Sequence, residues 1–396
     1  MQQYLSYRNK NYILDHVAVV PKEFTAQITL EDHQKAAKYT TAKSKVAMFS
    51  RVFDLALIIF WLPLGGAGFV NQYLYRFELS SIKQGIVFFS ILGIISTITS
   101  LPFTLYNTFI LEEKFGFNKT TPKTFALDML KQLLLSVIIA LPFLYVILYI
   151  MEGLGTFWWI YAWAFIITFQ FILMWAYPKF LAPLFNKFTP LDQEDFNLVV
   201  SKLCSKVGFE HKGVFVMDAS KRSSHGNAYF TGFGKNKRIV FFDTLIKSLL
   251  PIELEAILAH ELGHFKKKHI FKMLIINTLM MLVGFAVLGF LYQQYDFYTT
   301  FKFIKPAAHS ALYIFTSIIP IYTFFLTPVF SFFSRKNEYE ADEFAATHSS
   351  AEHLVTALLK LYKNNSSTLT PDPLFSKFYN SHPTALERIN FLNSLK

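Results

Sequence analysis

The sequence predicts a multi-spanning α-helical membrane protein that carries a mainly α, small β domain beside the membrane. Of its 396 residues, 53% are hydrophobic and only 16% are charged, and the mean hydropathy is +0.33. Soluble domains carry a charge on about a quarter of their residues, so much of this surface faces something other than water. Six apolar stretches are each long enough to cross about 30 Å of hydrocarbon. These expected spans are 53–73, 84–108, 130–151, 156–178, 270–292 and 308–333.

The spans and the polar segments between them divide the chain into five parts. These are an N-terminal arm (1–52), four transmembrane helices (53–178), a first polar block (179–269), two transmembrane helices (270–333) and a second polar block (334–396). Neither polar block buries a large core alone, so we expect the two to fold together as one domain. Short β-rich runs bounded by turn residues predict strands at 213–217, 227–230 and 238–242.

Lysine and arginine residues are unevenly distributed among the loops. The N-terminal arm and the segments after the second, fourth and sixth spans are rich in them, whereas the alternate loops are poor. Because cytoplasmic loops carry the excess of basic residues, both termini and both polar blocks are expected to be cytoplasmic, at an endoplasmic reticulum or bacterial inner membrane. The same rule accounts for the net charge of +11, so we expect no nucleic-acid partner. The single cysteine, Cys204, excludes an intramolecular disulfide and a cysteine-based zinc site.

The segment His260-Glu261-Leu262-Gly263-His264 is the most informative motif in the chain. It lies in an amphipathic stretch without proline or glycine from 252 to 262, which predicts a helix. Two imidazoles four residues apart on one face are well placed to hold Zn²⁺, and Glu261 can take a proton from water at the metal. The alternative is a helix with two surface histidines and a solvated glutamate, which the apolar flanks disfavour. We therefore interpret the motif as the zinc helix of a zincin-like metalloprotease domain.

A catalytic zinc site needs a third protein ligand and an open position. His269 lies five residues after His264 on a different helix face, so we expect it to be a surface or interface histidine. The metzincin spacing requires Gly at 267 and His at 270. This chain has Lys267 and Ile270 there, so that class is excluded.

Glu338 and Asp342 are better candidates, because they lie four residues apart on one face of a second predicted helix. Glu338 can complete a His₂Glu site, and Asp342 can orient a ligand imidazole through its free ring nitrogen. Glu340 lies on the other side and is the weaker choice. An exposed acidic helix start is the alternative, and residue chemistry alone favours the ligand interpretation without settling it.

Beyond these motifs, the chain resembles the type I CAAX prenyl proteases, which are integral-membrane zinc metalloendopeptidases of the gluzincin group. The similarity extends over nearly the whole sequence. Besides the zinc helix, the matching segments are Ile28–Thr40, Leu101–Tyr106, Glu113–Lys119, Asn227–Tyr229, Lys235–Val240, Phe242–Leu245, Arg335 with Glu338–Asp342, Ser381–Pro383 and Arg388–Ile389.

The resemblance implies a role for each candidate site residue. Glu338 would be the third ligand of one zinc ion, and Asp342 would be the carboxylate behind a ligand histidine. Glu261 would be the general base. His382 and Arg388 would contact the substrate carbonyl or stabilise the developing oxyanion.

The resemblance also implies how the substrate is held. An extended peptide would align along an edge strand containing Asn227, Ala228 and Tyr229. The implied substrates are prenylated CAAX proteins, cleaved after the modified cysteine in a water-filled chamber that the helices enclose within the membrane lipid. The oligomeric state is left open, and a monomer is consistent with all of these features.

One departure from the family concerns the N-terminus. The family usually has seven spans, and the apolar clusters within residues 1–27 are too short to cross. We expect either a start downstream of the family's own or a branch that dispenses with that helix. One wall of the chamber would then be open or differently closed.

Two other functions fit parts of the sequence. A broad-specificity quality-control protease of the membrane would use the same catalytic site, and the sequence does not separate it from a CAAX protease. A non-proteolytic transporter or receptor would be expected to lose Glu261 or a metal ligand and to carry ionisable residues in its spans. Asp54 is the clearest such residue, and one residue is weak support.

Overall fold

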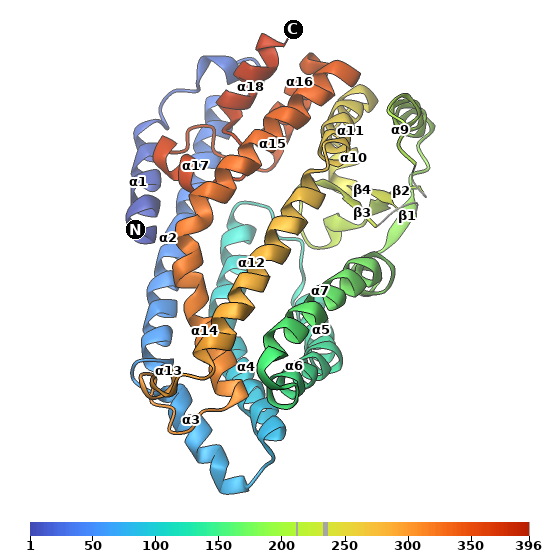
Figure 1. Cartoon of the computed structure of the whole chain (residues 1–396). Helices are drawn as coiled ribbons and strands as arrows, with labels where there is room; N and C mark the ends of the chain where they lie inside the picture. Colours follow the sequence, from blue (N-terminus) through green and yellow to red (C-terminus); the bar gives the residue numbers. More distant parts are fainter. Residues whose placement is uncertain (211–212, 233–236, 396) are drawn as a thin grey trace.

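The computed structural model describes residues 1–210, 213–232 and 237–395. Long helices form one end of the molecule, and shorter helices with a four-stranded sheet form the other (Figure 1). Lys235 and Asn236, from one of the segments that resemble the family, lie outside the described residues.

The helices fall into two groups along the chain. The first group is α1 (Gln2–Asp15), α2 (Leu30–Trp61), α3 (Gly66–Leu74), α4 (Ser81–Tyr106), α5 (Pro122–Leu135), α6 (Leu141–Gly153), α7 (Trp158–Ala176), α8 (Ala182–Phe185) and α9 (Glu194–Lys206). The second group is α10 (Asp243–Ile246), α11 (Pro251–Lys266), α12 (His269–Leu291), α13 (Tyr295–Thr299), α14 (Ala308–Thr323), α15 (Thr327–His348), α16 (Ala351–Asn364), α17 (Pro373–Tyr379) and α18 (Ala385–Ser394).

Five described helical segments are long and apolar enough to cross a membrane, and a bent pair of helices adds a sixth. The five are Ser81–Glu112, Pro122–Gly153, Gly155–Phe185, His269–Leu291 and Ala308–His348, and the pair is Leu30–Trp61 with Gly66–Phe77, bent by 47°. Each expected span overlaps one of these segments. The predicted multi-spanning helical architecture is therefore confirmed.

Two spans extend well beyond the boundaries predicted from hydropathy. α2 begins at Leu30 instead of residue 53, and the Thr29 hydroxyl caps its first turn by accepting a 3.1 Å hydrogen bond from the Asp32 backbone. The last span continues through a short 3₁₀ segment into α15 and ends at His348. Both extensions are polar, so a hydropathy window does not detect them, although the helices continue. They carry the membrane helices directly into the polar end of the molecule.

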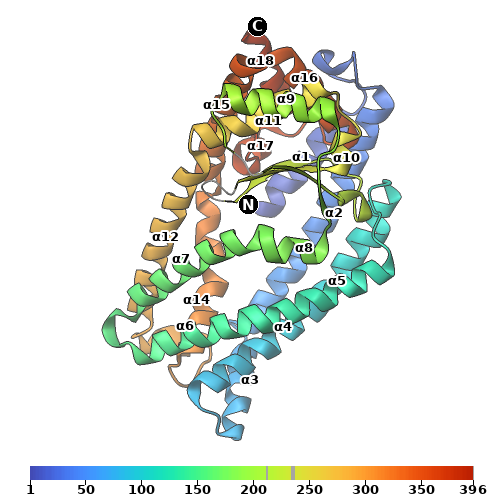
Figure 2. The same cartoon turned by 90° about the vertical axis from the view of Figure 1, so that its right-hand side faces the viewer.

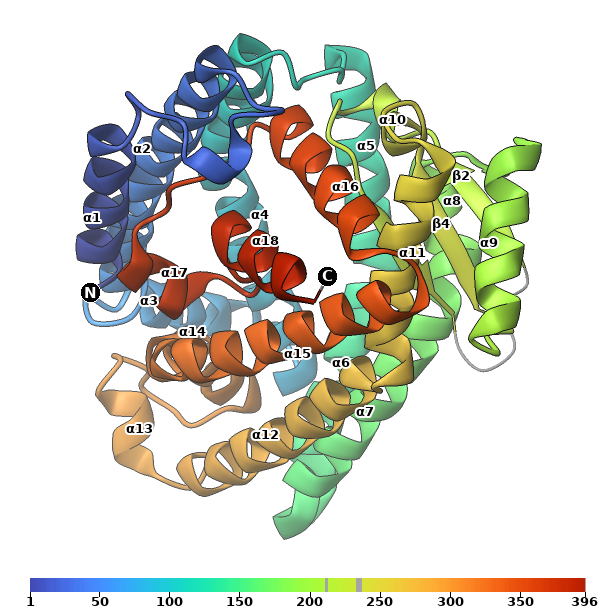
Figure 3. The same ribbon diagram turned by 90° about the horizontal axis from the view of Figure 1, so that it is seen from above.

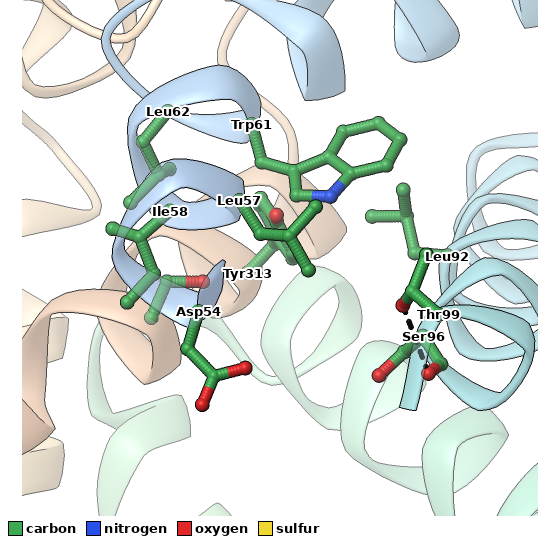
Figure 4. Close-up of a pocket in the computed structure, with 10 residues that line it drawn as sticks. Asp54, Leu57, Ile58, Trp61, Leu62, Leu92, Ser96, Thr99 and Tyr313 are labelled. Atoms are coloured by element: carbon green, nitrogen blue, oxygen red, sulfur yellow. Dashed lines mark hydrogen bonds between the residues drawn. The ribbon is translucent and has the colours of Figure 1, made fainter. Parts of the chain in front are cut away.

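Seen from above, the helices are arranged as a ring around the axis of the molecule (Figure 3), and Figure 2 shows the same helices from the side. Only 6–17% of an apolar window in each of the five spans is buried inside the protein, which fits helices that expose apolar surface to lipid. One cavity of about 270 Å³ lies between α2, α4 and α14, and Asp54 lines it beside Trp61 and Ser96 (Figure 4). Asp54 thus borders a cavity, the usual setting for an ionisable residue within a span.

The first residues of the chain form part of the wall of a larger cavity, of about 1310 Å³. Ser6 and Asn9 on α1 line this cavity. Arg8 forms a 2.9 Å ion pair with Asp372, and the Asp372 backbone donates a 2.8 Å hydrogen bond to the Asn9 side chain. α1 is thereby fastened to the start of α17, at the edge of this cavity.

The sheet contains β1 (Phe188–Pro190), β2 (Val214–Met217), β3 (Ala228–Thr231) and β4 (Arg238–Phe242), in the order β1-β2-β4-β3. β2 and β4 are parallel, and the two outer strands run antiparallel to their neighbours. The three strands expected from the sequence are present. β1 was not predicted, because three residues that end in Pro190 show no alternating pattern. β3 is an edge strand of this sheet.

Both polar blocks contribute to one hydrophobic core. Its buried members include Leu203 on α9, Leu254 and Leu262 on α11, Ala345 on α15 and Leu392 on α18. These residues come from both sides of the α12–α14 membrane hairpin. A shared core therefore holds α11 and α15 against each other.

Candidate metal centre

α11 presents His260 and His264 on one face, one turn apart. Pro251 occupies the first turn of the helix, where its missing N–H costs nothing, and the predicted helix is present over Pro251–Lys266. His260 is 6% exposed. Gly263 allows α11 to approach α15 closely, because a Cβ added there would lie 2.9 Å from the Ala341 Cα. The glycine of the motif is thus a packing requirement.

Glu338 on α15 faces both histidines. Its Oε2 lies 3.5 Å from His260 Nε2, and its Oε1 lies 3.2 Å from His264 Nε2. The two Nε2 atoms are 3.2 Å apart. The structure therefore brings together the three residues expected to be metal ligands, from two helices separated by 74 positions in the chain (338 − 264).

These separations fit a metal ion. A tetrahedral site with bonds of about 2.0–2.1 Å has ligand atoms roughly 3.3 Å apart, close to the three distances between these side chains. Two imidazoles and one carboxylate form a ligand set typical of catalytic zinc sites, in which the fourth position stays open. Among the described residues, His260, His264 and Glu338 are the potential ligands that lie close enough together to hold one metal ion.

His260 is braced by a buried ion pair. Its Nδ1 lies 2.7 Å from Asp342 Oδ1, so a proton on Nδ1 bonds the carboxylate and leaves Nε2 free for a metal. Arg388 on α18 donates to both oxygens of Asp342, at 2.9 and 2.5 Å. Burial and Arg388 lower the pKa of His260, but bonds to Asp342 and Glu338 raise it more, to about 9. Metal binding at neutral pH would therefore displace a proton from this imidazole.

His264 is braced differently, through a second histidine. Its Nδ1 lies 3.0 Å from His269 Nδ1, and His269 Nε2 lies 3.1 Å from Glu340 Oε2. With His264 binding through Nε2, its Nδ1–H donates to His269, whose Nε2–H donates to Glu340. Of the two expected settings for His269, surface or interface, the structure shows the interface, since its side chain is buried between His264 on α11 and Glu340 on α15. A sharp turn at Lys268, with φ of 58°, starts α12 and returns His269 toward α11.

His382 and Glu261 lie beside the three proposed ligands. His382 Nδ1 is 2.7 Å from Glu338 Oε2, and its side chain is 62% exposed. Glu261 is half-buried next to His260. Arg388, by contrast, is buried, with Nη1 3.8 Å from Glu338 Oε2. The two residues expected to stabilise the oxyanion thus differ in their surroundings. His382 is open to solvent, whereas Arg388 is buried and paired with Asp342.

The segment before β3 is held by side chains that the sequence analysis did not single out. Asn365, after α16, accepts a 3.0 Å hydrogen bond from the Gly226 backbone and donates at 3.2 Å to the Gly226 carbonyl. His225 contacts the Tyr39 hydroxyl at 3.3 Å and Glu112 at 3.5 Å. These contacts join four distant parts of the chain, so no local sequence pattern reveals them.

Asn227 lies between this held segment and β3. Its carbonyl accepts a 3.0 Å hydrogen bond from the Phe242 backbone, and its side chain lines the cavity of about 1310 Å³. Ala228 and Tyr229 follow on the edge strand. Tyr379 and Asn380, shortly before His382, line the same cavity. The cavity therefore extends from the edge strand toward the loop that carries His382.

Comparisons with known proteins cover the whole chain. The family profile described as "CAAX prenyl protease N-terminal, five membrane helices" matches residues 10–187, and that of "Peptidase family M48" matches residues 190–396. CAAX prenyl protease 1 of Saccharomyces cerevisiae is 36% identical over 99% of this chain and 92% of its own length. The CAAX prenyl protease 1 homolog of Homo sapiens is 32% identical over 95% of this chain and 89% of its own.

A solved structure agrees with these relatives. The crystal structure of S. mikatae Ste24p matches with a TM-score of 0.92 and 35% identity, over 99% of this chain and 95% of that one. Full-length similarity, spanning helices and the cluster of His260, His264 and Glu338 lead to one conclusion. The chain belongs to peptidase family M48, as a membrane metalloendopeptidase of its CAAX prenyl protease branch.

Proposed function

We propose that this protein is a zinc-dependent endopeptidase that removes the C-terminal tripeptide from prenylated CAAX proteins. The observation that carries the proposal is the braced His260–His264–Glu338 cluster, which lies in a domain joined directly to the spanning helices. Relatives named as CAAX prenyl proteases match nearly end to end, which favours this substrate class over broad quality-control proteolysis. A transporter or receptor would have no use for an intact ligand set with Glu261 beside it.

The protein's own residues divide the chemistry between them. When bound, Zn²⁺ polarises the scissile carbonyl and makes water more acidic. Glu261 takes the proton from the attacking water and returns it to the leaving amine. His382 donates to the developing oxyanion, and Arg388 adds positive charge there while it holds Asp342 against His260.

The substrate would bind as an added strand on β3. An edge strand offers unpaired backbone groups, so an extended peptide gains register along Asn227, Ala228 and Tyr229 through backbone hydrogen bonds. The amide of Asn365 would fix the start of this edge by pairing with both backbone groups of Gly226. The neighbouring cavity gives the peptide room beside the edge strand.

The proposed location is the endoplasmic reticulum membrane, with the catalytic domain and both termini in the cytoplasm. The distribution of basic residues supports this orientation, because the N-terminal arm and the segments after the second, fourth and sixth spans carry the excess of lysine and arginine. Cysteines introduced singly into exposed loops would report it. We expect a cysteine in place of the exposed Asn364, at the end of α16, to react with an impermeant thiol reagent from the cytoplasmic side, and one near Gly155 to react from the other side. The reverse pattern would refute the orientation.

The substrate assignment is tested with full-length protein in detergent and a farnesylated CAAX peptide. We expect zinc-dependent cleavage after the modified cysteine, none with the same peptide lacking the lipid, and none with a Glu261→Gln variant that still binds zinc. Equal cleavage of both peptides would show general membrane proteolysis instead. A zinc-loaded wild-type protein that cleaves neither peptide would contradict the proposed substrate.

A further inference from the structure

A basic pocket lies on the outside of the molecule, where the membrane helices meet the sheet. It has a volume of about 520 Å³ and is formed by α5, the segment around α8, β1, β2 and β4. Figure 2 shows α8 between the end of α7 and the sheet, with α5 nearby. The charged residues that line it are Lys131, Lys187, Asp218, Lys221 and Arg238. The pocket thus has four cations and one carboxylate, a net charge of +3 (4 − 1).

The single carboxylate does not neutralise these cations. Asp218 Oδ1 already accepts hydrogen bonds from the Lys187 backbone at 2.7 Å and from the Asn186 side chain at 3.2 Å. A neighbouring cation shows the contrast, because Arg222 is neutralised by Asp128 through contacts of 2.7 and 2.9 Å. Among the described residues, no carboxylate lies within ion-pair distance of the four cations of the pocket.

Two of the cations are held in place without being neutralised. Lys131 donates a 2.6 Å hydrogen bond to the Leu184 carbonyl and lies 5.7 Å from the Phe185 ring. Arg238 lies 5.1 Å from the Phe215 ring. Carbonyl and aromatic contacts leave the full positive charge available to an anion. Two cations of the pocket are therefore positioned by these contacts, and the exposed Lys187 and Lys221 lie beside them.

Its surroundings place the pocket at the level of the lipid head groups. Trp175 and Tyr177, at the end of the same span as α8, are both 53% exposed, and Lys179 lies 5.6 Å from the Trp175 ring. Aromatic residues with adjacent lysines mark the boundary between hydrocarbon and water. Leu130 and Leu184, which flank the pocket, are 52% and 45% exposed and would contact acyl chains. A lipid can therefore reach the pocket from the bilayer.

We propose that this pocket binds the phosphate-containing head group of an anionic phospholipid, from the leaflet on the side of the catalytic domain. Basic pockets beside membrane helices suit such head groups, because the phosphate meets several cations at once. Lys131 comes from a membrane helix, and Arg238 belongs to β4, which pairs with the edge strand β3. A bound head group thus links the membrane helices to the sheet that we propose aligns the substrate.

The test uses delipidated full-length protein in a neutral detergent. Dioctanoyl phosphatidylserine is titrated against it, with dioctanoyl phosphatidylcholine, glycerophosphoserine and inorganic phosphate in parallel. Bound lipid is counted by native mass spectrometry, and the melting temperature is followed. We expect the anionic lipid to bind and to raise the melting temperature, with an effect that weakens as salt is added.

A double variant, Lys187→Gln with Lys221→Gln, removes half of the positive charge of the pocket. Its affinity for the anionic lipid is expected to fall by roughly tenfold or more. The charge-matched control, Lys202→Gln with Lys247→Gln, changes two exposed lysines of the same domain outside the pocket, and should bind as the wild type does. Zinc content verifies that each variant is folded.

Three results would overturn the proposal. The first is unchanged lipid affinity in the pocket variant. The second is equal binding of phosphatidylcholine, which would show a site for acyl chains alone. The third is inorganic phosphate or glycerophosphoserine that binds as tightly as the lipid, which would show a site for a soluble anion.

Discussion

The two histidines of the proposed metal centre are supported by networks of different character. His260 rests on Asp342, which is completely buried and held by the buried Arg388. His264 rests on the buried His269, which in turn contacts Glu340, a carboxylate with 29% of its side chain exposed. The network behind His260 is an ion pair buried away from water. The network behind His264 ends in a carboxylate whose charge is screened by water. The metal centre should therefore depend far more on the first network than on the second.

The largest effect is expected from Asp342→Ala. This change leaves Arg388 buried without its partner, and breaking a buried pair costs about 3–5 kcal/mol of the free energy of unfolding. It also frees the His260 ring, and loss of such a partner lowers metal affinity by about 10–100-fold. The melting temperature of the metal-free protein and a zinc competition titration measure the two effects. Asp342→Asn, which keeps the shape and one acceptor, should be milder, and an equal loss in both variants would show that the charge is unimportant.

Gly263→Ala should disturb both networks together. The new methyl group would lie 2.9 Å from the Ala341 Cα, so α11 and α15 must separate, at a cost of about 1–3 kcal/mol. We expect a lower melting temperature and weaker zinc binding. The matched control is Gly93→Ala on α4, where an added Cβ has no neighbour within 4 Å. Equal behaviour of the two variants would mean that the close approach of α11 and α15 is not needed.

His269→Gln tests the second network at its buried member. The Gln side chain does not reproduce the ring that accepts from His264 and donates to Glu340, so zinc affinity should fall by about tenfold. Zinc competition at neutral pH measures the change. His16→Gln, which alters an exposed histidine at the end of α1, is the control. A loss as large as that of Asp342→Ala would remove the proposed difference between the networks.

The smallest effect is expected from Glu340→Gln. Partly exposed ion pairs contribute about 0–1 kcal/mol and are screened by salt. Zinc affinity should fall less than in His269→Gln, and added salt should reduce the difference from the wild type. Glu343→Gln, an exposed neighbour on α15, supplies the comparison for a lost charge. A salt-independent loss would indicate that Glu340 acts as strongly as a buried group.

The sequence predicted the spans and the zinc helix because both are local patterns. An apolar run of sufficient length and two histidines four residues apart leave a clear mark within about 20 residues. Glu338 and Asp342 could be proposed because their spacing also places them on one helix face. The structure brings them to the histidines as that interpretation requires.

The contacts that sequence reasoning missed depend on distant parts of the chain. His269 was expected on a different helix face from His264 because a continuous helix was assumed, whereas Lys268 adopts a left-handed conformation that starts a new helix. The contact between Asn365 and Gly226 joins residues 139 positions apart. The start of α2 at Leu30 was missed for another reason. A helix end in polar sequence is signalled by its cap at Thr29 and not by hydropathy.

The most direct test of the metal centre is zinc K-edge X-ray absorption on the purified full-length protein. We predict one zinc ion per chain, with two imidazole nitrogens at about 2.0–2.1 Å and oxygen ligands at about 2.0–2.2 Å. In a Glu338→Gln variant, the scattering from oxygen ligands should change. The scattering from the two imidazoles should remain for whatever zinc is still bound. A wild-type spectrum without two imidazoles, or one that the Glu338 change leaves unaltered, would contradict the proposed ligand set.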